Sequence, residues 1–159
     1  MCIRDREYSI PDNPNIPSDE LLKEFYQELV EALLRQFPDH TDGIDRTCIV
    51  DLDSSTPSKF SRHWIVHLPS KALFKDSHEV GKFVKSFIQQ LADEVATEQL
   101  LLRCPCLHKY LFVVPKGKAS DQDGDINLPV PLSQKTCFVD LGVYTRNRLF
   151  RLLLSLIHI

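Results

Sequence analysis

Three side chains that bind anionic oxygens recur at alternate positions in one short stretch, namely Lys59, Ser61 and His63. Side chains two residues apart on a strand point to the same face, so this stretch would present an ammonium, a hydroxyl and an imidazole in one row. Such a row suits an oxygen-rich anion such as a triphosphate. An edge hairpin with a solvated polar face has the same spacing, and by spacing alone we favour it.

Paired carboxylates are the second feature with chemical potential. Phosphoryl transfer with divalent metal ions needs carboxylates that hold two cations about 3.5–4 Å apart. The candidate pairs are Asp5 with Glu7 and Asp51 with Asp53, and Asp140 is a remote third candidate. Taken alone, the pair at 51 and 53 is the first choice, because alternation puts both side chains on one face of a strand. Aspartates at a strand end before Ser, Thr and Pro, however, more often stabilise a turn.

The composition is that of one soluble globular domain, with 159 residues, 43% hydrophobic and 26% charged. The net charge of -3 gives no global basic field, although an acidic metal site and a local basic groove would cancel in that sum. Five cysteines at irregular spacings and the lack of an apolar segment after Met1 favour a reduced intracellular protein. The longest apolar run, 152–159, is too short to span a bilayer, so no membrane partner is expected.

Two amphipathic helices are predicted. An apolar stripe over 21–34 indicates the first, which Ser18 would cap and Pro38 would end. Its expected role is to cover a sheet, since it carries no set of ligands. Ser77 would cap the second helix, whose apolar residues recur at helical spacing over 80–95.

Short strands are predicted between and after these helices. They are expected at 47–53, 62–68, 110–114, 137–140 and 143–153. The Gly-, Asp- and Pro-rich stretch 116–131 has no periodicity and indicates a mobile loop. This order of elements favours an α+β fold, with a mixed sheet backed by helices on one face in an RRM-like arrangement.

Cys104, Cys106 and His108 invite a zinc interpretation, because three possible ligands lie within five residues. A structural zinc site needs four ligands, and no second Cys/His pair stands nearby. A tight turn with two buried thiols is therefore the favoured explanation.

Two longer strings resemble motifs of the eukaryotic primase-polymerase (PrimPol) family, in the archaeo-eukaryotic primase superfamily. The string LDSST followed by KFSRH is similar to the family's Ser-x-His region, and FVDLGVYTRNR is similar to its third motif. By this resemblance, Lys59, Ser61 and His63 contact the incoming nucleotide. The implied fold is a partial catalytic core of that superfamily.

The resemblance also assigns the metal-binding carboxylates. In the family they are an Asp-x-Glu pair upstream and an aspartate downstream, which matches Asp140 here. The string EYSIPDNP is similar to the family's sequence around and after the glutamate of that pair, so Glu7 is the motif's glutamate and Asp5 falls in the register of its aspartate. Arg148 matches a nucleotide-contacting arginine, and Arg151 matches a basic residue of less defined role.

These assignments predict a geometry. Glu7 and Asp140 should lie on neighbouring strands with converging carboxylates, because both must reach the same cations. Asp51 and Asp53 should instead point towards main-chain amides of the turn.

The resemblance implies a DNA-directed primase/polymerase, a nucleotidyltransferase that adds nucleotides to a 3′-hydroxyl on a DNA template during repriming and damage-tolerant synthesis. It implies a two-metal site for Mn²⁺ or Mg²⁺, DNA template and primer with nucleoside triphosphates as substrates, replication protein A as a partner, and a place in the nucleus and mitochondrion. A metal-dependent phosphoesterase and a non-catalytic nucleotide- or nucleic-acid-binding module remain as alternatives. The set Lys59, Ser61, His63 and Arg148 suits a triphosphate better than a water nucleophile.

The resemblance runs from Glu7 to about Leu152, so 7–152 is expected to be a partial catalytic domain. Residues 1–6 and 153–159 resemble translated sequencing-adapter sequence and are expected to be a non-native leader and tail, which places Asp5 inside the leader. The family's zinc knuckle and the tail that binds replication protein A are not among these residues. We therefore expect the 159-residue chain alone to be inactive as a polymerase.

Overall fold

A computed structural model gives the fold, and it describes residues 2–40, 43–69, 74–117 and 131–144. The helices are α1 (Ser18–Gln36), α2 (Ser77–Ala96) and α3 (Pro105–Tyr110). The strands are β1 (Cys2–Ser9), β2 (Ile49–Asp53), β3 (Lys59–Val66), β4 (Phe112–Val113) and β5 (Thr136–Cys137). Short 3₁₀ turns occur at Pro38–His40, Arg46–Cys48, Leu100–Leu102, Leu132–Gln134 and Leu141–Tyr144. Within the described ranges, no helix is both long and apolar enough to cross a membrane.

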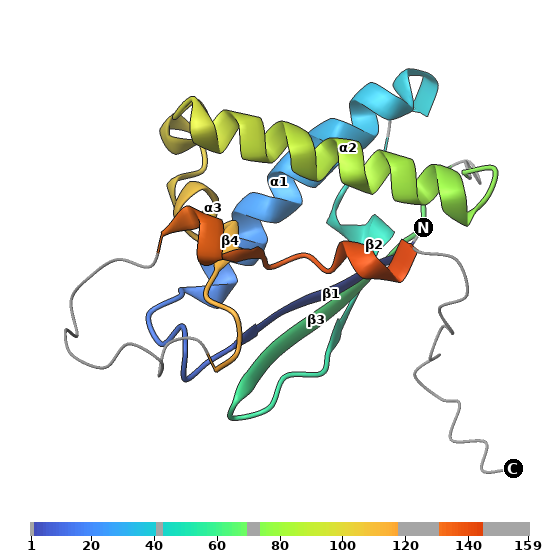
Figure 1. Cartoon of the computed structure of the whole chain (residues 1–159). Helices are drawn as coiled ribbons and strands as arrows, with labels where there is room; N and C mark the ends of the chain where they lie inside the picture. Colours follow the sequence, from blue (N-terminus) through green and yellow to red (C-terminus); the bar gives the residue numbers. More distant parts are fainter. Residues whose placement is uncertain (1, 41–42, 70–73, 118–130, 145–159) are drawn as a thin grey trace, which may run out of the picture.

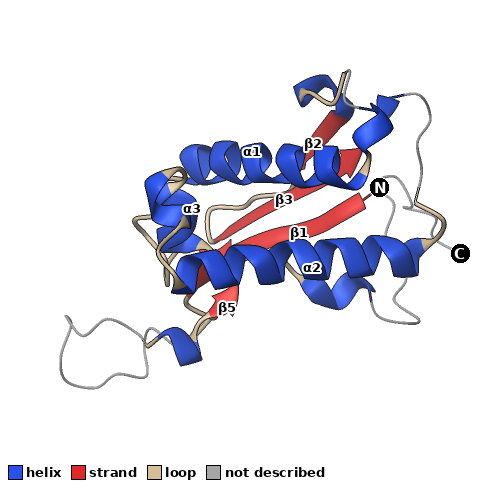
Figure 2. Cartoon of the chain, turned by 90° about the horizontal axis from the view of Figure 1, so that it is seen from above, coloured by secondary structure: helices blue, strands red, loops and turns tan. Residues whose placement is uncertain are grey.

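The larger sheet is antiparallel and has the strand order β1-β3-β2. β3 is the central strand, with Glu7 of β1 opposite Ser61 and Leu52 of β2 opposite His63. β4 and β5 form a separate antiparallel pair. In Figure 1, α1 and α2 lie on the same side of the larger sheet, and Figure 2 looks down on both helices with the strands behind them. The molecule is therefore a helical layer on one face of a small sheet.

Aromatic side chains join the two layers. Phe25 of α1 is fully buried, and its ring centroid lies 5.7 Å from that of Trp64 on β3. The same ring lies 5.6 Å from Phe87 of α2 and 5.3 Å from Phe138, which follows β5. Burial of such large rings stabilises a fold strongly, and each close ring pair adds about 0.5–1.5 kcal/mol. The core therefore fixes α1, α2 and the segment after β5 against the sheet.

The predicted α+β class and both long helices are confirmed. The predicted mixed sheet is wrong for the described residues, because every strand pair among them is antiparallel. A strand was expected at Glu7, but β1 extends back to Cys2, into residues that were expected to be a non-native leader. β1 pairs with β3 on the side away from β2, and a strand in that place completes an antiparallel order.

The helix caps differ from those predicted. Ser18 is the first residue of α1 rather than its cap, and its hydroxyl instead hydrogen-bonds the Tyr8 hydroxyl at 2.7 Å. Asp76, not Ser77, caps α2 by accepting a hydrogen bond from the Glu79 N–H at 2.9 Å. The backbone at Asp76 is extended, as an N-cap requires, whereas Ser77 is already helical.

The short strands are also displaced from their predicted positions. The strand expected at 110–114 is only Phe112–Val113, because Tyr110 ends α3. The strand expected at 137–140 stops at Cys137, the last residue of β5. Residues 141–144 form a 3₁₀ turn, although the next strand was expected to start at 143. The rest of the predicted strand at 143–153 and most of the predicted loop at 116–131 lie outside the described residues. Strands as short as β4 and β5 leave no period-two pattern to detect.

Two buried carboxylates of α1 hold the end of the helical layer. Glu28 accepts two hydrogen bonds from the Arg103 guanidinium, at 2.7 and 3.0 Å, and a third from the Cys104 thiol at 3.3 Å. Glu24 accepts the Leu107 N–H at 2.7 Å, which satisfies an amide in the first turn of α3. Cys106 and His108 thus lie in the short helix α3, with Cys104 directly before it, and not in the tight turn that was predicted. Burial, and then the hydrogen bond to Glu28, raise the pKa of Cys104 to about 12, so this thiol is a neutral donor.

Candidate functional site

The row formed by Lys59, Ser61 and His63 lies on the sheet face opposite the helices. Residues of even number on β3, such as Phe60 and Trp64, are buried beneath the helices, so the odd-numbered row takes the other face. Glu7 joins this row, because it lies directly opposite Ser61 and opposed residues share a face. None of the described helices covers that face in Figure 1.

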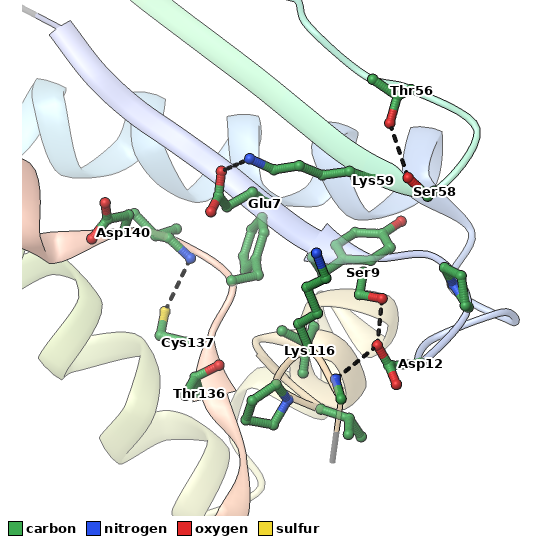
Figure 3. A pocket seen from close by; sticks show the side chains of 18 of the residues that line it. Glu7, Ser9, Asp12, Thr56, Ser58, Lys59, Lys116, Thr136, Cys137 and Asp140 are labelled. Carbon is green, nitrogen blue, oxygen red and sulfur yellow. Dashed lines mark hydrogen bonds and ion pairs between the residues drawn. The ribbon is translucent and has the colours of Figure 1, made fainter. Parts of the chain in front are cut away.

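A pocket of about 880 Å³ opens at one end of this row (Figure 3). Its lining comes from four separate segments, within 7–12, 56–59, 113–117 and 136–141. Glu7, Lys59 and Asp140 all belong to it. The pocket therefore brings together one residue from each of the three family motifs that the sequence indicated.

Glu7 and Lys59 form an ion pair inside this pocket. The Lys59 ammonium contacts Oε2 of Glu7, and Figure 3 shows the lysine side chain extended along the strand towards the carboxylate. The two side chains, of Lys59 and Glu7, are 47% and 41% exposed, so both charges remain in contact with solvent. The contact is diagonal across the strand pair, since Lys59 lies opposite Ser9.

Main-chain contacts between β1 and the segment after β5 bring Asp140 to the same pocket. The Glu7 N–H donates to the Phe138 carbonyl at 2.9 Å, and Arg6 forms an isolated antiparallel bridge with Val139. Asp140 follows that bridge directly, and its Oδ1 accepts the Gly142 N–H at 2.7 Å. Asp140 therefore sits in a turn rather than on the neighbouring strand that the sequence predicted.

Ser61 and His63 lie beyond the pocket lining, farther along β3. Ser61 is only 7% exposed, and its main chain holds the hairpin by bonding Ser54 at 2.9 Å and the Ser55 hydroxyl at 3.0 Å. His63 is half-buried opposite Leu52. The predicted nucleotide contacts thus form a line that starts in the pocket at Lys59 and continues outward along the strand.

Asp51 and Asp53 lie away from this pocket and share the cation of Arg62. The distances to the Arg62 guanidinium are 3.3 Å from Asp51 and 3.2 Å from Asp53. Asp53 also accepts the Ser55 N–H at 2.8 Å, and hydrogen bonds from Ser55 hold the pKa of Asp53 below its usual value. The predicted turn role is thus found at Asp53, whereas Asp51 is turned towards a side chain instead, because Arg62 is within its reach.

Three predicted site residues fall partly or wholly outside the described residues. The backbone of Asp5 belongs to β1, one residue before Arg6, but its side chain is not described. Arg148 and Arg151 lie in the undescribed stretch 145–159. Their assignments stay predictions.

The structure adds residues at the site that sequence reasoning missed. The Asn13 side-chain amide donates to the Val114 carbonyl at 3.0 Å and accepts the Val114 N–H at 2.9 Å. It therefore satisfies both main-chain groups of the residue that follows β4. Asp12 accepts a hydrogen bond from Ser9 and the Gly117 N–H at 3.3 Å. The Asp-Asn-Pro turn signal at 12–14 was the available clue. These contacts join the turn at 12–13 to the segment 114–117, and both segments contribute to the lining of the pocket.

Cys137 also lines the pocket but cannot serve as a nucleophile. Burial raises the pKa of its thiol to about 11, so the reactive thiolate is scarce at neutral pH. The chemistry of the pocket therefore rests on its carboxylates and on the Lys59 ammonium.

The oxygen donors of the pocket fit a hard divalent cation. Carboxylates are the ligands that Mg²⁺ and Mn²⁺ prefer, and Glu7 and Asp140 bring two of them to one cavity. No group of three or more His, Cys, Asp or Glu side chains that could hold a metal ion occurs among the described residues. Two of the three predicted carboxylates, those of Glu7 and Asp140, thus line one pocket, and their role in metal binding stays a prediction.

Comparisons with known proteins bear on this site. No family model matches the chain. Over 93% of its length, the chain is 30% identical to a protein of Danio rerio named DNA-directed primase/polymerase protein. Proteins of the same name from Homo sapiens and Mus musculus are 28% and 30% identical over the same share of the chain.

The chain spans only 28%, 32% and 30% of the lengths of those three relatives, in the order Danio rerio, Homo sapiens and Mus musculus. The match nevertheless covers both strings that carry the resemblance, which is therefore confirmed. Over 93% of its length, this chain is similar to one part of these proteins named DNA-directed primase/polymerase protein.

Proposed function

We propose that this chain forms part of a nucleotidyltransferase that extends a 3′-hydroxyl on a DNA template with nucleotides from nucleoside triphosphates. One observation carries the proposal. Glu7 and Asp140, from opposite ends of the sequence, line a single pocket together with the Lys59 ammonium. Carboxylates beside a cation are the set that metal-dependent transfer of a nucleotide requires. The names of the relatives support the same class of enzyme.

In this proposal Glu7 and Asp140 hold divalent cations, Mn²⁺ or Mg²⁺, with Asp5 as the third ligand. When bound, such cations polarise the phosphate under attack and neutralise the pyrophosphate that leaves. The chain's own part is to place the two carboxylates. β1 carries Glu7, and the bridge between Arg6 and Val139 brings Asp140 to the lining of the same pocket.

The triphosphate would lie along β3. Lys59 contacts its charged oxygens at the pocket, and Ser61 and His63 continue the row on the same face. Four residues of strand span about 13 Å, so the row from Lys59 to His63 is long enough to follow an extended triphosphate. Arg148 and Arg151 complete the proposed set by resemblance.

The proposal extends to repriming and damage-tolerant synthesis on DNA template and primer, to binding of replication protein A, and to action in the nucleus and mitochondrion. The names of the relatives support primase and polymerase activity directed by DNA, and the other parts rest on the resemblance alone. They concern the whole gene product, of which the pocket supplies the site of nucleotide transfer.

A primer-extension assay with the complete gene product, a DNA template and Mn²⁺ tests the proposal. Glu7→Gln and Asp140→Asn should each lower incorporation by at least about a hundredfold, because a lost metal ligand removes several kcal/mol of transition-state stabilisation. Asp53→Asn is the matched control and should leave incorporation unchanged. Phosphate release without extension would indicate a phosphoesterase, and nucleotide binding without turnover would indicate a binding module. Either result would overturn the proposal.

A further inference from the structure

The carboxylate proposed to hold metal is already engaged by the lysine proposed to hold phosphate. Glu7 and Lys59 form an ion pair on the open face of the sheet, and both line the pocket (Figure 3). A metal ion that binds Glu7 must compete with the ammonium for the charge of this carboxylate, whose Oε2 the ammonium contacts. The displaced ammonium then carries an uncompensated charge close to a doubly charged cation.

Asp140 is engaged in another way. Its Oδ1 accepts the Gly142 N–H at 2.7 Å, and no Lys or Arg side chain among the described residues forms an ion pair with it. The ion pair at Glu7 therefore introduces a difference between the two proposed ligands. One is ready for a cation, and the other is neutralised until Lys59 moves.

Lys59 has the freedom to move while its backbone stays in place. Its main chain is tied to Thr56 by hydrogen bonds of 2.8 and 3.2 Å, which fix the hairpin. Its side chain is 47% exposed, so the ammonium can leave Glu7 without disturbing the core. An oxygen-rich anion arriving along β3 offers that ammonium a new partner.

We infer that Lys59 makes the site select a divalent cation that carries a nucleoside triphosphate over the same cation alone. This inference rests on the proposed function and adds a specificity-determining role to Lys59. A bare cation must break the ion pair and tolerate the freed ammonium. A cation bound to a triphosphate brings phosphate oxygens that accept the ammonium, so the same exchange becomes favourable. Binding of metal and of nucleotide is thereby coupled, and each strengthens the other to the same degree.

The expected size of the effect depends on the exposure of the pair. An ion pair of this exposure changes an equilibrium constant by up to roughly fivefold, and the repulsion between ammonium and cation adds to that. Without nucleotide, Mn²⁺ should therefore bind the Lys59→Ala variant about three- to tenfold more tightly than the unsubstituted chain. With nucleotide, the order should reverse, because the variant has lost a phosphate contact worth roughly tenfold in affinity.

Calorimetric titration of the 159-residue chain with MnCl₂ tests this inference, first alone and then with a non-hydrolysable deoxynucleoside triphosphate. Lys59→Arg keeps the charge and should bind Mn²⁺ within about twofold of the unsubstituted chain. Lys116→Ala removes a different ammonium from the lining of the same pocket and should also stay within about twofold. Circular dichroism of each variant checks that the fold is retained.

The titration separates failure of this inference from failure of the proposed function. If Glu7→Gln abolishes Mn²⁺ binding but Lys59→Ala does not tighten it, the inference is wrong and the metal site stands. Equal tightening by Lys59→Ala and Lys116→Ala would also overturn it, because the effect would then be one of net charge. If Mn²⁺ binding is absent or indifferent to Glu7→Gln, both the inference and the proposed metal site are wrong.

Discussion

The main-chain N–H of Glu7 donates a hydrogen bond to the carbonyl oxygen of Phe138 at 2.9 Å. This bond joins the first strand to the segment that carries Asp140, so it links two of the predicted motifs through the backbone. Phe138 is fully buried, and its ring packs edge-on against Phe25 at 5.3 Å. The position of Asp140 in the pocket therefore depends on the hydrophobic core beneath it.

Truncation of Phe138 should consequently impair both stability and metal binding. Phe138→Ala should lower the free energy of unfolding by about 3–5 kcal/mol, because it removes a buried ring and leaves a cavity. Urea unfolding measures that loss. Mn²⁺ affinity at temperatures where the variant is folded should fall as well, since Asp140 loses its anchor. Phe138→Leu keeps most of the volume and should lose less in both measurements. Normal Mn²⁺ affinity in a destabilised Phe138→Ala variant would contradict the link.

The sequence predicts the helices well because each has a continuous apolar stripe, and α1 ends before Pro38 as expected. The sequence does not predict the full extent of β1, because its partner strand β3 lies about fifty residues away. The caps fail for a local reason, since Asp76 and Ser77 are adjacent and both are good cap residues. Only the backbone conformation decides which of the two is used.

Part of the lining of the pocket was predictable from the sequence, and its contacts were not. Motif strings identified Glu7, Lys59 and Asp140, and all three line one pocket. The ion pair between Glu7 and Lys59 depends on the register of β1 against β3, which no local pattern encodes. The same holds for Asn13, whose partner Val114 is distant in sequence.

Replacement of His63 should weaken nucleotide binding and leave the fold intact. His63→Ala removes a charge-assisted hydrogen bond worth about 1.5–3 kcal/mol, which corresponds to roughly ten- to hundredfold in affinity. Titration with Mn²⁺ and a nucleoside triphosphate measures the change. His67→Ala, at a position beyond the end of β3, is the matched control and should bind normally. Unchanged affinity in His63→Ala would remove this residue from the site and end the row at Ser61.

The buried ion pair between Arg103 and Glu28 should matter for stability and not for binding. Arg103→Met leaves the Glu28 carboxylate, 3% exposed, without its cation, and should lower the free energy of unfolding by about 2–4 kcal/mol. The double variant Arg103→Met with Glu28→Leu removes both charges and should recover much of that loss. A double variant less stable than Arg103→Met alone would show that the pair is not what makes the single change harmful.

Cys137 should be slow to react with iodoacetamide in the folded chain. Burial raises its pKa to about 11, so at pH 8 its thiolate fraction is about a hundredfold below that of an ordinary thiol. Mass spectrometry of the alkylated peptides measures the rate, with the urea-unfolded chain as control. The raised pKa also sets a direction for stability: the contribution of the neutral thiol is full below about pH 8.5 and is lost as the pH rises towards 11. Rapid alkylation of Cys137 at pH 8 would contradict its burial.

The central claim is that Glu7 and Asp140 bind the same divalent cations. A crystal structure of the chain with Mn²⁺ and a non-hydrolysable deoxynucleoside triphosphate, with anomalous scattering to locate manganese, tests it directly. We predict an anomalous peak within about 2.5 Å of a carboxylate oxygen of both residues, with the Lys59 ammonium moved from Glu7 to the phosphates. Manganese bound at Asp51 and Asp53 instead, with none at Glu7, would contradict the account.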